Sequence, residues 1–148
     1  MTEGRIAILL VEDNLGDATL LSILFEESLC PMDLVHVHNG EQALIYLRER
    51  KEKGRPDLIL LDLKMPKMSG LDFLRERQKD KDISSIPTIV LTGSDARSDL
   101  DDALLLGADM YMIKPSDIDE ADSLLPTIEM FIKRFKPQIS WSGCSPPS

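Results

Sequence analysis

Five polar residues directly follow or end apolar runs along the chain, and their types suit phosphoryl chemistry. Glu12 and Asp13 come after the first run, and Asp62 follows the third. Thr92 follows the fourth run, and Lys114 follows the fifth. If the runs are parallel strands, their carboxyl ends meet at one edge of the sheet, and we expect these side chains to converge. Crowded carboxylates repel one another unless a cation neutralises them, and an oxygen-lined site with few protein ligands suits Mg²⁺.

Such a cluster is suited to phosphoryl transfer through a carboxylate nucleophile. A carboxylate beside Mg²⁺ and an ammonium can attack phosphorus, because charge neutralisation and in-line positioning are most of what this reaction requires. Asp62 would be the nucleophile. The Thr92 hydroxyl would donate to one phosphoryl oxygen, and Lys114 would place its positive charge at another.

Taken singly, each of these residues also has a purely structural interpretation. Glu12-Asp13 would serve as the acidic start of a helix capped by Asp13 or Asn14. Asp62 would suit a turn, Lys114 would suit an exposed surface, and threonine is common at strand ends. Their joint placement after successive strands favours the functional interpretation.

Strand and helix patterns alternate along the chain. Apolar runs of strand length cover residues 6–11, 58–61, 86–91 and 110–113, and residues 34–38 alternate as in a strand nearer an edge. Segments with apolar residues at helical spacing lie between them. This alternation predicts an α/β fold with one parallel sheet of about five strands and helices on both faces. We expect the doubly wound, flavodoxin-like arrangement, whose strand order is 2-1-3-4-5. In that order Asp13 and Asp62 lie side by side.

The sequence allows two interpretations of the turn at Asn39-Gly40 and of the last helix, which contains Pro126. Asn39-Gly40 is compatible with a hairpin, but helical spacing follows it, so we expect a strand-to-helix turn. The last helix should begin near Asp117 or Ile118, and Pro126 predicts that it is kinked or starts late. We expect one domain over residues 1–136 and a loose tail over 137–148, whose Trp141 is solvated or docked.

Composition and charge exclude several classes of protein. The 148 residues suit about one domain, and 26 acidic against 17 basic residues give a formal charge of −9, which disfavours nucleic-acid and membrane partners. Cys30 and Cys144 belong to no Cys/His cluster, and no export signal or span of about 18 apolar residues is present. We interpret His36 and His38, on one strand face, as structural or solvent-facing. A cytoplasmic protein is expected.

Four motifs resemble the receiver domain of the two-component response regulators, over the chain from Arg5 to about Phe135. They are LLVEDN (9–14), LILLDLKMPKMSG (58–70), IPTIVLTGSD (86–95) and GADMYMIKP (107–115). Residues 51–63 and 82–92 most resemble small stand-alone regulators that pair with phytochrome-type or related sensor histidine kinases.

The resemblance implies a chemistry for the cluster. Asp62 would accept a phosphoryl group from the phosphohistidine of a sensor histidine kinase. Asp13, Asp62 and the backbone carbonyl of Lys64 would ligate Mg²⁺, and Glu12 would act mostly through water. The Lys64 side chain, two residues after Asp62, would influence how long the acyl phosphate survives.

The resemblance also implies a switch. Thr92 and Tyr111 would form the switch pair, and the Lys114–Pro115 bond would be cis, a form that only X-Pro bonds adopt at low cost. Two positions depart from or vary within the family pattern. Ser116 stands where many members carry Phe, and Ser94 lies where a side chain can gate the hydrolytic water.

Three functions from different classes are compatible with these residues. The first is a phosphorylation-controlled switch without an output domain, which is a phosphoacceptor and not a turnover enzyme. Its partners would be a sensor histidine kinase, a downstream protein or phosphotransfer domain, and a second copy. The second copy would bind through the face formed by the fourth predicted helix, around residues 100–105, and the last helix, around residues 128–135. A phosphohydrolase is disfavoured, because Asp62-Leu63-Lys64 offers a lysine where a second carboxylate is needed. A flavin or nucleotide binder is disfavoured because the loop over residues 12–17 is anionic.

Overall fold

The computed structural model describes residues 6–27, 32–50, 54–93, 97–115 and 118–135. The predicted tail over residues 137–148 lies outside these ranges, as do Cys30, Ser94, Ser116, Trp141 and Cys144. Within the described ranges, no helix combines the length and the apolar composition needed to cross a lipid bilayer.

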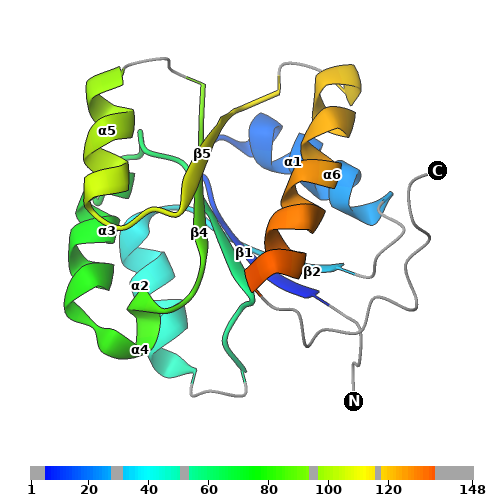
Figure 1. The fold of residues 1–148 in the computed structure, drawn as a ribbon. Helices are drawn as coiled ribbons and strands as arrows, with labels where there is room; N and C mark the ends of the chain where they lie inside the picture. The colour runs from blue at the N-terminus through cyan, green and yellow to red at the C-terminus, as the bar shows by residue number, and fades with distance from the viewer. Residues whose placement is uncertain (1–5, 28–31, 51–53, 94–96, 116–117, 136–148) are drawn as a thin grey trace.

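Five parallel strands form one sheet in the order β2-β1-β3-β4-β5 (Figure 1). This confirms the predicted flavodoxin-like architecture, including the edge position of β2. Val11 pairs with Leu61, so the residues that follow β1 and β3 leave the sheet side by side. The strands are β1 (Ile6–Val11), β2 (Met32–Val37), β3 (Leu58–Leu61), β4 (Thr88–Thr92) and β5 (Met110–Ile113).

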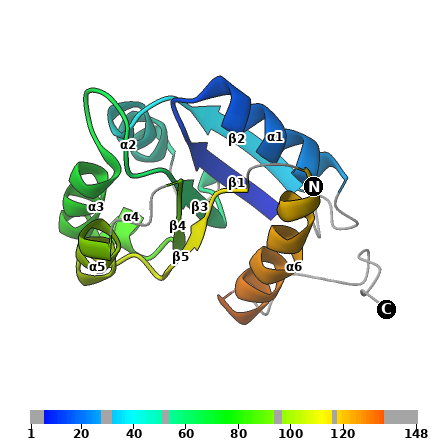
Figure 2. The ribbon, with the colours of Figure 1, turned by 90° about the horizontal axis from the view of Figure 1, so that it is seen from above.

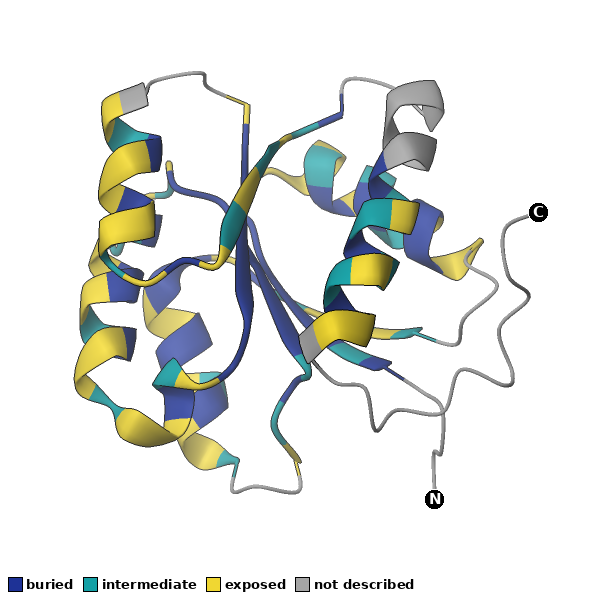
Figure 3. Ribbon diagram, in the orientation of Figure 1, coloured by how far each residue is buried: buried dark blue, intermediate teal, exposed yellow. Residues whose placement is uncertain are grey.

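Helices cover both faces of the sheet, as Figures 1 and 2 show. Successive strand residues point to opposite faces, so Leu9 and Val11 belong to one buried core and Ile8 and Leu10 to the other. The central strands of the sheet and the inner sides of the helices are buried, whereas the two edge strands are partly exposed and the outer sides of the helices are exposed (Figure 3). One face carries α1 (Leu15–Glu26) and α6 (Ile118–Phe135), and the other carries α2 (Gly40–Glu49), α3 (Gly70–Lys79), α4 (Lys81–Ser84) and α5 (Arg97–Leu105).

Asparagine caps start the helices that follow β1 and β2. The Asn14 side-chain oxygen accepts a hydrogen bond from the Asp17 N–H at 2.9 Å, which starts α1. Asn39 accepts from the Gln42 N–H at 2.9 Å, which starts α2. Each cap satisfies an N–H that has no partner inside its helix. The second cap confirms that Asn39-Gly40 forms a strand-to-helix turn.

Helix α6 begins at Ile118, as predicted, and runs through Pro126, so the alternative of a late start is wrong. An interior proline costs about 3 kcal/mol, because it removes a backbone donor and clashes with the preceding turn. Leu124, Ile128 and Ile132 are buried against the sheet, and burial of each contributes roughly 1.5–3 kcal/mol. Packing of this apolar stripe therefore outweighs the cost of the proline.

Two local features differ from the expectations. The described residues contain no cis peptide bond, so the Lys114–Pro115 bond is trans, the form that X-Pro bonds favour intrinsically. The short helix α4, capped by Asp80, was not predicted. Four residues are too few to give a helical period in the sequence.

A buried arginine connects α3 to the amino-terminal ends of β4 and β5. The Arg77 guanidinium donates to the Ile86 carbonyl at 2.7 Å and to the Gly107 carbonyl at 3.2 Å. It lies 3.8 Å from the Asp109 carboxylate, which accepts from the Thr88 N–H at 2.8 Å. Arg77 is 3% exposed, so these contacts replace the water that its charge has lost.

We expect Arg77→Met to lower the free energy of unfolding by about 2–4 kcal/mol, because the Ile86 and Gly107 carbonyls lose the guanidinium as a donor and Asp109 loses its cation. Arg75→Met, on the same helix, is the matched control. Arg75 pairs with Asp72 at 2.9 Å on an exposed surface, and such a pair contributes about 1 kcal/mol or less. Urea unfolding followed by circular dichroism measures both losses, and equal losses would contradict the prediction.

Candidate functional site

A polar cleft of about 650 Å³ opens at the carboxyl edge of the sheet. The strand order reverses between β1 and β3, so the connections that follow them diverge to opposite faces and leave a space. All five residues that the sequence singled out line this cleft. Its lining residues are Glu12, Asp13, Asn14, Leu15, Asp17, Asp62, Lys64, Thr92, Gly93 and Lys114.

Backbone hydrogen bonds fix three of these residues just beyond the strand ends. The Glu12 N–H donates to the last carbonyl of β2, and the Asp62 N–H donates to the last carbonyl of β1, both at 3.0 Å. The Lys114 N–H donates to the last carbonyl of β4 at 2.9 Å. The hydrogen-bond ladder thus continues one residue past each strand, and the rigid sheet holds these Cα positions.

Three carboxylates converge in the cleft, as predicted. Glu12, Asp13 and Asp62 each offer a ligand atom, and these atoms lie within 4.8 Å of one another. Glu12 and Asp62 are buried, whereas Asp13 is exposed. This set of hard oxygen donors, open to solvent on one side, fits a divalent cation of the Mg²⁺ class.

The Lys114 ammonium lies among these carboxylates. Its Nζ is 2.6 Å from Glu12 Oε1, 3.0 Å from Asp17 Oδ2 and 3.4 Å from Asp62 Oδ2. Asp17 was not predicted to belong to this cluster. Its only sequence signal is an acidic residue in the first turn of a helix, where a carboxylate is common because it favours the helix dipole.

Burial and charge oppose one another in the ionisation of this cluster. Burial, together with the negative charge of Asp62, raises the pKa of Glu12 from 4.5 to about 7, although the hydrogen bond from Lys114 opposes the rise. Burial alone would lower the pKa of Lys114, but its hydrogen bonds to Glu12 and Asp17 and the charge of Asp62 raise it above its usual value. Lys114 is therefore a fixed cation at neutral pH.

A glycine lets the connection after β3 pass close to Asp62. The Gly70 N–H donates to the Leu63 carbonyl at 2.9 Å, and α3 begins at Gly70. A Cβ at this position would lie 2.4 Å from the Asp62 carbonyl oxygen, which is shorter than any van der Waals contact. The absence of a side chain at Gly70 thus allows α3 to start beneath the strand end. Lys64, in the same connection, is exposed at the cleft.

The predicted switch residues lie on neighbouring strands but in different surroundings. Thr92, at the end of β4, is buried at the cleft. Tyr111 on β5 pairs with Val90, two residues before Thr92, and is 41% exposed on the outer side of the molecule. The structure thus places only Thr92 at the cleft.

The two histidines lie beside the cleft at the edge of the sheet. His36 Nε2 donates to the Glu12 carbonyl oxygen at 2.6 Å, so His36 helps to hold the strand end that carries Glu12. The His38 ring is tilted against the His36 ring, with 4.5 Å between their centroids. His38 is exposed. These contacts agree with the structural interpretation of the pair.

The model of the response regulator receiver domain family matches residues 8–125 of the chain. The chain belongs to this family. Response regulator Rcp1 from Synechocystis is 32% identical over 127 residues, which cover 84% of this chain and 86% of Rcp1. The probable methanogenesis regulatory protein FilR2 from Methanothrix harundinacea is 33% identical over 131 residues, which cover 87% of this chain and 84% of FilR2.

Solved receiver structures match the fold of this receiver domain. The phosphorylated cyanobacterial phytochrome response regulator RcpA matches with a TM-score of 0.79 and 33% identity, over 97% of this chain and 99% of RcpA. The Mn²⁺-bound form of Rcp1 matches with a TM-score of 0.75 and 32% identity, over 85% of this chain and 93% of that chain. The resemblance of the motifs to phytochrome-associated regulators is thereby confirmed.

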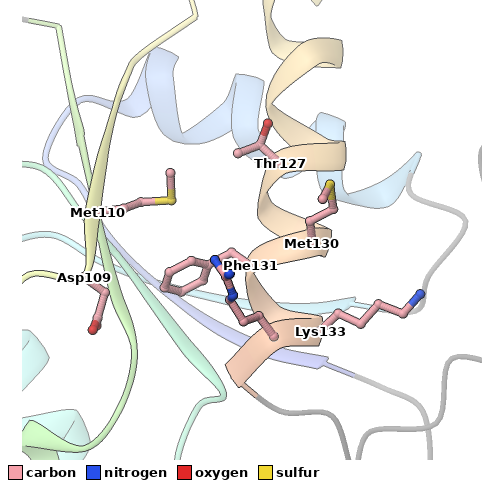
Figure 4. Close-up of a pocket in the computed structure, with 7 residues that line it drawn as sticks. Asp109, Met110, Thr127, Met130, Phe131 and Lys133 are labelled. Carbon is pink, nitrogen blue, oxygen red and sulfur yellow. The ribbon is translucent and has the colours of Figure 1, made fainter.

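A second, larger groove of about 900 Å³ lies between β5 and α6 of this receiver domain. Figure 4 shows Met110 and Phe131 pointing toward one another across it, whereas Lys133 points away from the strand. Its side chains are mostly apolar or basic, and Asp109 is the carboxylate among them. Because this lining offers a single carboxylate and not a cluster of them, we assign the chemistry to the smaller cleft.

Proposed function

We propose that this receiver domain accepts a phosphoryl group on Asp62 from the phosphohistidine of a sensor histidine kinase. The observation that carries the proposal is the Lys114 ammonium, 3.4 Å from Asp62 Oδ2 within a cluster of carboxylates. The Asp62 carboxylate is the nucleophile. The Lys114 ammonium beside it supplies the positive charge that neutralises the incoming phosphoryl oxygens. The similarity to RcpA, solved in its phosphorylated form, supports this function.

The transfer exchanges one bond to phosphorus for another. A carboxylate oxygen of Asp62 forms a P–O bond while the P–N bond to the donor imidazole breaks, and the electron pair of that bond returns to the ring nitrogen. Lys114 then contacts one phosphoryl oxygen, and the Thr92 hydroxyl donates to another. Hydrolysis by water breaks the P–O bond and returns the Asp62 carboxylate and inorganic phosphate.

The carboxylates that surround Asp62 suit a divalent cation, and we propose Mg²⁺. Asp13, Asp62 and the Lys64 backbone carbonyl would hold it directly, and Glu12 would contact it through water. When bound, the cation supplies positive charge that offsets the crowded carboxylates and the phosphoryl oxygens. The similarity to Rcp1, which was solved in a Mn²⁺-bound form and is 32% identical, supports the binding of a divalent cation.

We propose that the protein is a phosphoacceptor and not a turnover enzyme. The cleft places a lysine, Lys64, two residues after Asp62, where a phosphohydrolase of this type needs a carboxylic acid. Incubation with acetyl phosphate and Mg²⁺, followed by intact-mass analysis and a phosphate assay, separates the two. A single labile adduct per chain supports the phosphoacceptor, whereas steady release of phosphate over many equivalents supports the hydrolase.

The output is a change of protein contacts on the face formed by α5, β5 and α6. The phosphoryl group would draw the Thr92 hydroxyl toward it, and Tyr111 on the neighbouring strand would turn inward to fill the vacated space. This face exposes Leu105 and Ile113, at 80% and 51%, which suits a modest interface. Its partner would be a second copy, a downstream protein or a phosphotransfer domain.

Asp62→Asn is expected to abolish phosphoryl uptake and to leave the fold intact, because the amide keeps the shape of the side chain but is not a nucleophile. Asp72→Asn, at the exposed start of α3, is the control and should be labelled like the wild type. Intact mass after incubation with acetyl phosphate measures both. Full labelling of the Asp62→Asn variant would place the phosphoryl group on another residue.

Asp13→Asn is expected to weaken Mg²⁺ binding by about tenfold or more, because it removes the charge of a ligand. Isothermal titration calorimetry measures the affinity, with Asp72→Asn as a control that removes the same charge far from the cleft. An unchanged affinity for Mg²⁺ would contradict the assigned ligand set.

Treatment with beryllofluoride and Mg²⁺, which mimics the phosphorylated aspartate, is expected to change amide exchange across residues 92–135 and to favour dimers in sedimentation. The Asp62→Asn protein, treated in the same way, is the control. If treated and untreated wild type have identical exchange, sedimentation and partner affinity, the output mechanism is wrong.

A further inference from the structure

Asp17 closes a ring of interactions that joins β1, α1 and β5. Glu12 Oε1 contacts the Lys114 ammonium, and Glu12 Oε2 accepts from the Asn14 N–H at 3.1 Å. The Asn14 side chain caps α1 by accepting from the Asp17 N–H at 2.9 Å. Asp17 Oδ2 then returns to Lys114 Nζ at 3.0 Å, a hydrogen bond between residues 97 positions apart.

We propose that Asp17 is a positioning residue for phosphoryl transfer, which holds the Lys114 ammonium toward Asp62 in concert with Glu12. The inference rests on the proposed function, since it assigns to Asp17 a part in the same reaction. It acts through Lys114 and makes no bond to the phosphoryl group.

The geometry of an ammonium explains why two anchors suffice. A lysine Nζ carries three N–H donors at tetrahedral angles, and three carboxylates surround this one. The contacts with Glu12 and Asp17 are the short ones, at 2.6 and 3.0 Å, and the contact with Asp62 is longer at 3.4 Å. Two donors are therefore engaged by the anchors, and the third remains for the side where the phosphoryl group arrives.

The two anchors approach Lys114 from different environments. The Glu12 side chain is 1% exposed and lies inside the cleft, whereas the Asp17 side chain is 37% exposed. A lysine side chain is a flexible four-carbon stem, so a single anchor would leave its ammonium free to rotate about that contact. With Asp17 present, the ammonium is held from the inner and the outer side.

Two simpler roles of Asp17 give different results. A carboxylate in the first turn of a helix favours the helix dipole wherever it occurs, and Asp72 has the same place in α3, with its N–H bonded to the Ser69 cap. A carboxylate at the cleft would also repel anionic phosphodonors. This repulsion would weaken the binding of the donor more than it would slow the transfer of the phosphoryl group. Positioning of Lys114 instead affects the maximal rate of transfer.

The test compares Asp17→Ala, Asp17→Asn and Asp72→Ala with the wild-type protein. Phosphorylation by acetyl phosphate with Mg²⁺ is followed over a range of donor concentrations. We expect Asp17→Ala to lower the maximal rate about fivefold, with little change in the half-saturating concentration, as suits the loss of one partly exposed contact. Asp17→Asn keeps an acceptor oxygen and should recover part of the rate, and Asp72→Ala should match the wild type.

A second measurement does not depend on phosphorylation. The ¹⁵N–¹H signal of the Lys114 ammonium, assigned by its loss in Lys114→Met, should be broadened by faster exchange in Asp17→Ala and unchanged in Asp72→Ala. If the wild type takes up no phosphoryl group, the proposed function fails, and this signal still reports whether Asp17 holds Lys114.

Three results would overturn the inference. One is a maximal rate and a Lys114 signal that are both unchanged in Asp17→Ala. Another is a change confined to the half-saturating concentration, which would mean simple repulsion of the donor. The third is an equal loss of rate in Asp72→Ala, which would mean a general effect of helix stability.

Discussion

The site depends on one electrostatic constraint: buried carboxylates at the end of the sheet need positive charge beside them. Glu12 and Asp62 are almost fully buried, and an unpaired buried carboxylate is costly. The Lys114 ammonium contacts both carboxylates, and the raised pKa of Lys114 keeps it charged. The same crowding of carboxylates makes the cleft suitable for a divalent cation. Together with the Lys114 ammonium, such a cation would supply the positive charge that a phosphoryl group needs. The charges that stabilise the protein are thus the same charges on which the proposed phosphoryl transfer depends.

The parallel sheet satisfies this constraint with backbone hydrogen bonds rather than with loops. Glu12, Asp62 and Lys114 each continue the ladder one residue beyond a strand, so their separation follows from strand spacing and register. The side chains then need only short reaches to meet. At the opposite end of the sheet, Arg77 joins α3 to the residues that precede β4 and β5.

The position of the site also determines how a signal could leave it. Thr92 and Lys114 end the last two strands, and β5 is an edge strand flanked by α5 and α6. A charge change at the cleft therefore lies close to an outer surface, without having to cross the core. The apolar groove between β5 and α6 belongs to that outer surface, which carries exposed Tyr111, Ile113 and Met130.

Local sequence patterns were sufficient to predict the parallel sheet and five of the residues that line the cleft, and the flavodoxin-like arrangement supplied the strand order. Strand and helix periods are properties of short segments, and a parallel sheet brings all its carboxyl ends together whatever the details of packing. The motif resemblance added the family, which the family match confirmed. Helix α4 was missed because four residues carry no period.

Only the tertiary structure decided the contacts between distant elements. Asp17 and Lys114 are 97 positions apart, and their hydrogen bond exists because the first turn of α1 packs beside the end of β5. The course of α6 through Pro126 likewise depends on apolar side chains that pack against the sheet, and their burial outweighs a local penalty. Local sequence determines which segments form and which polar residues end them, whereas packing across the sheet determines which side chains meet, because those free energies arise only when distant segments are brought together.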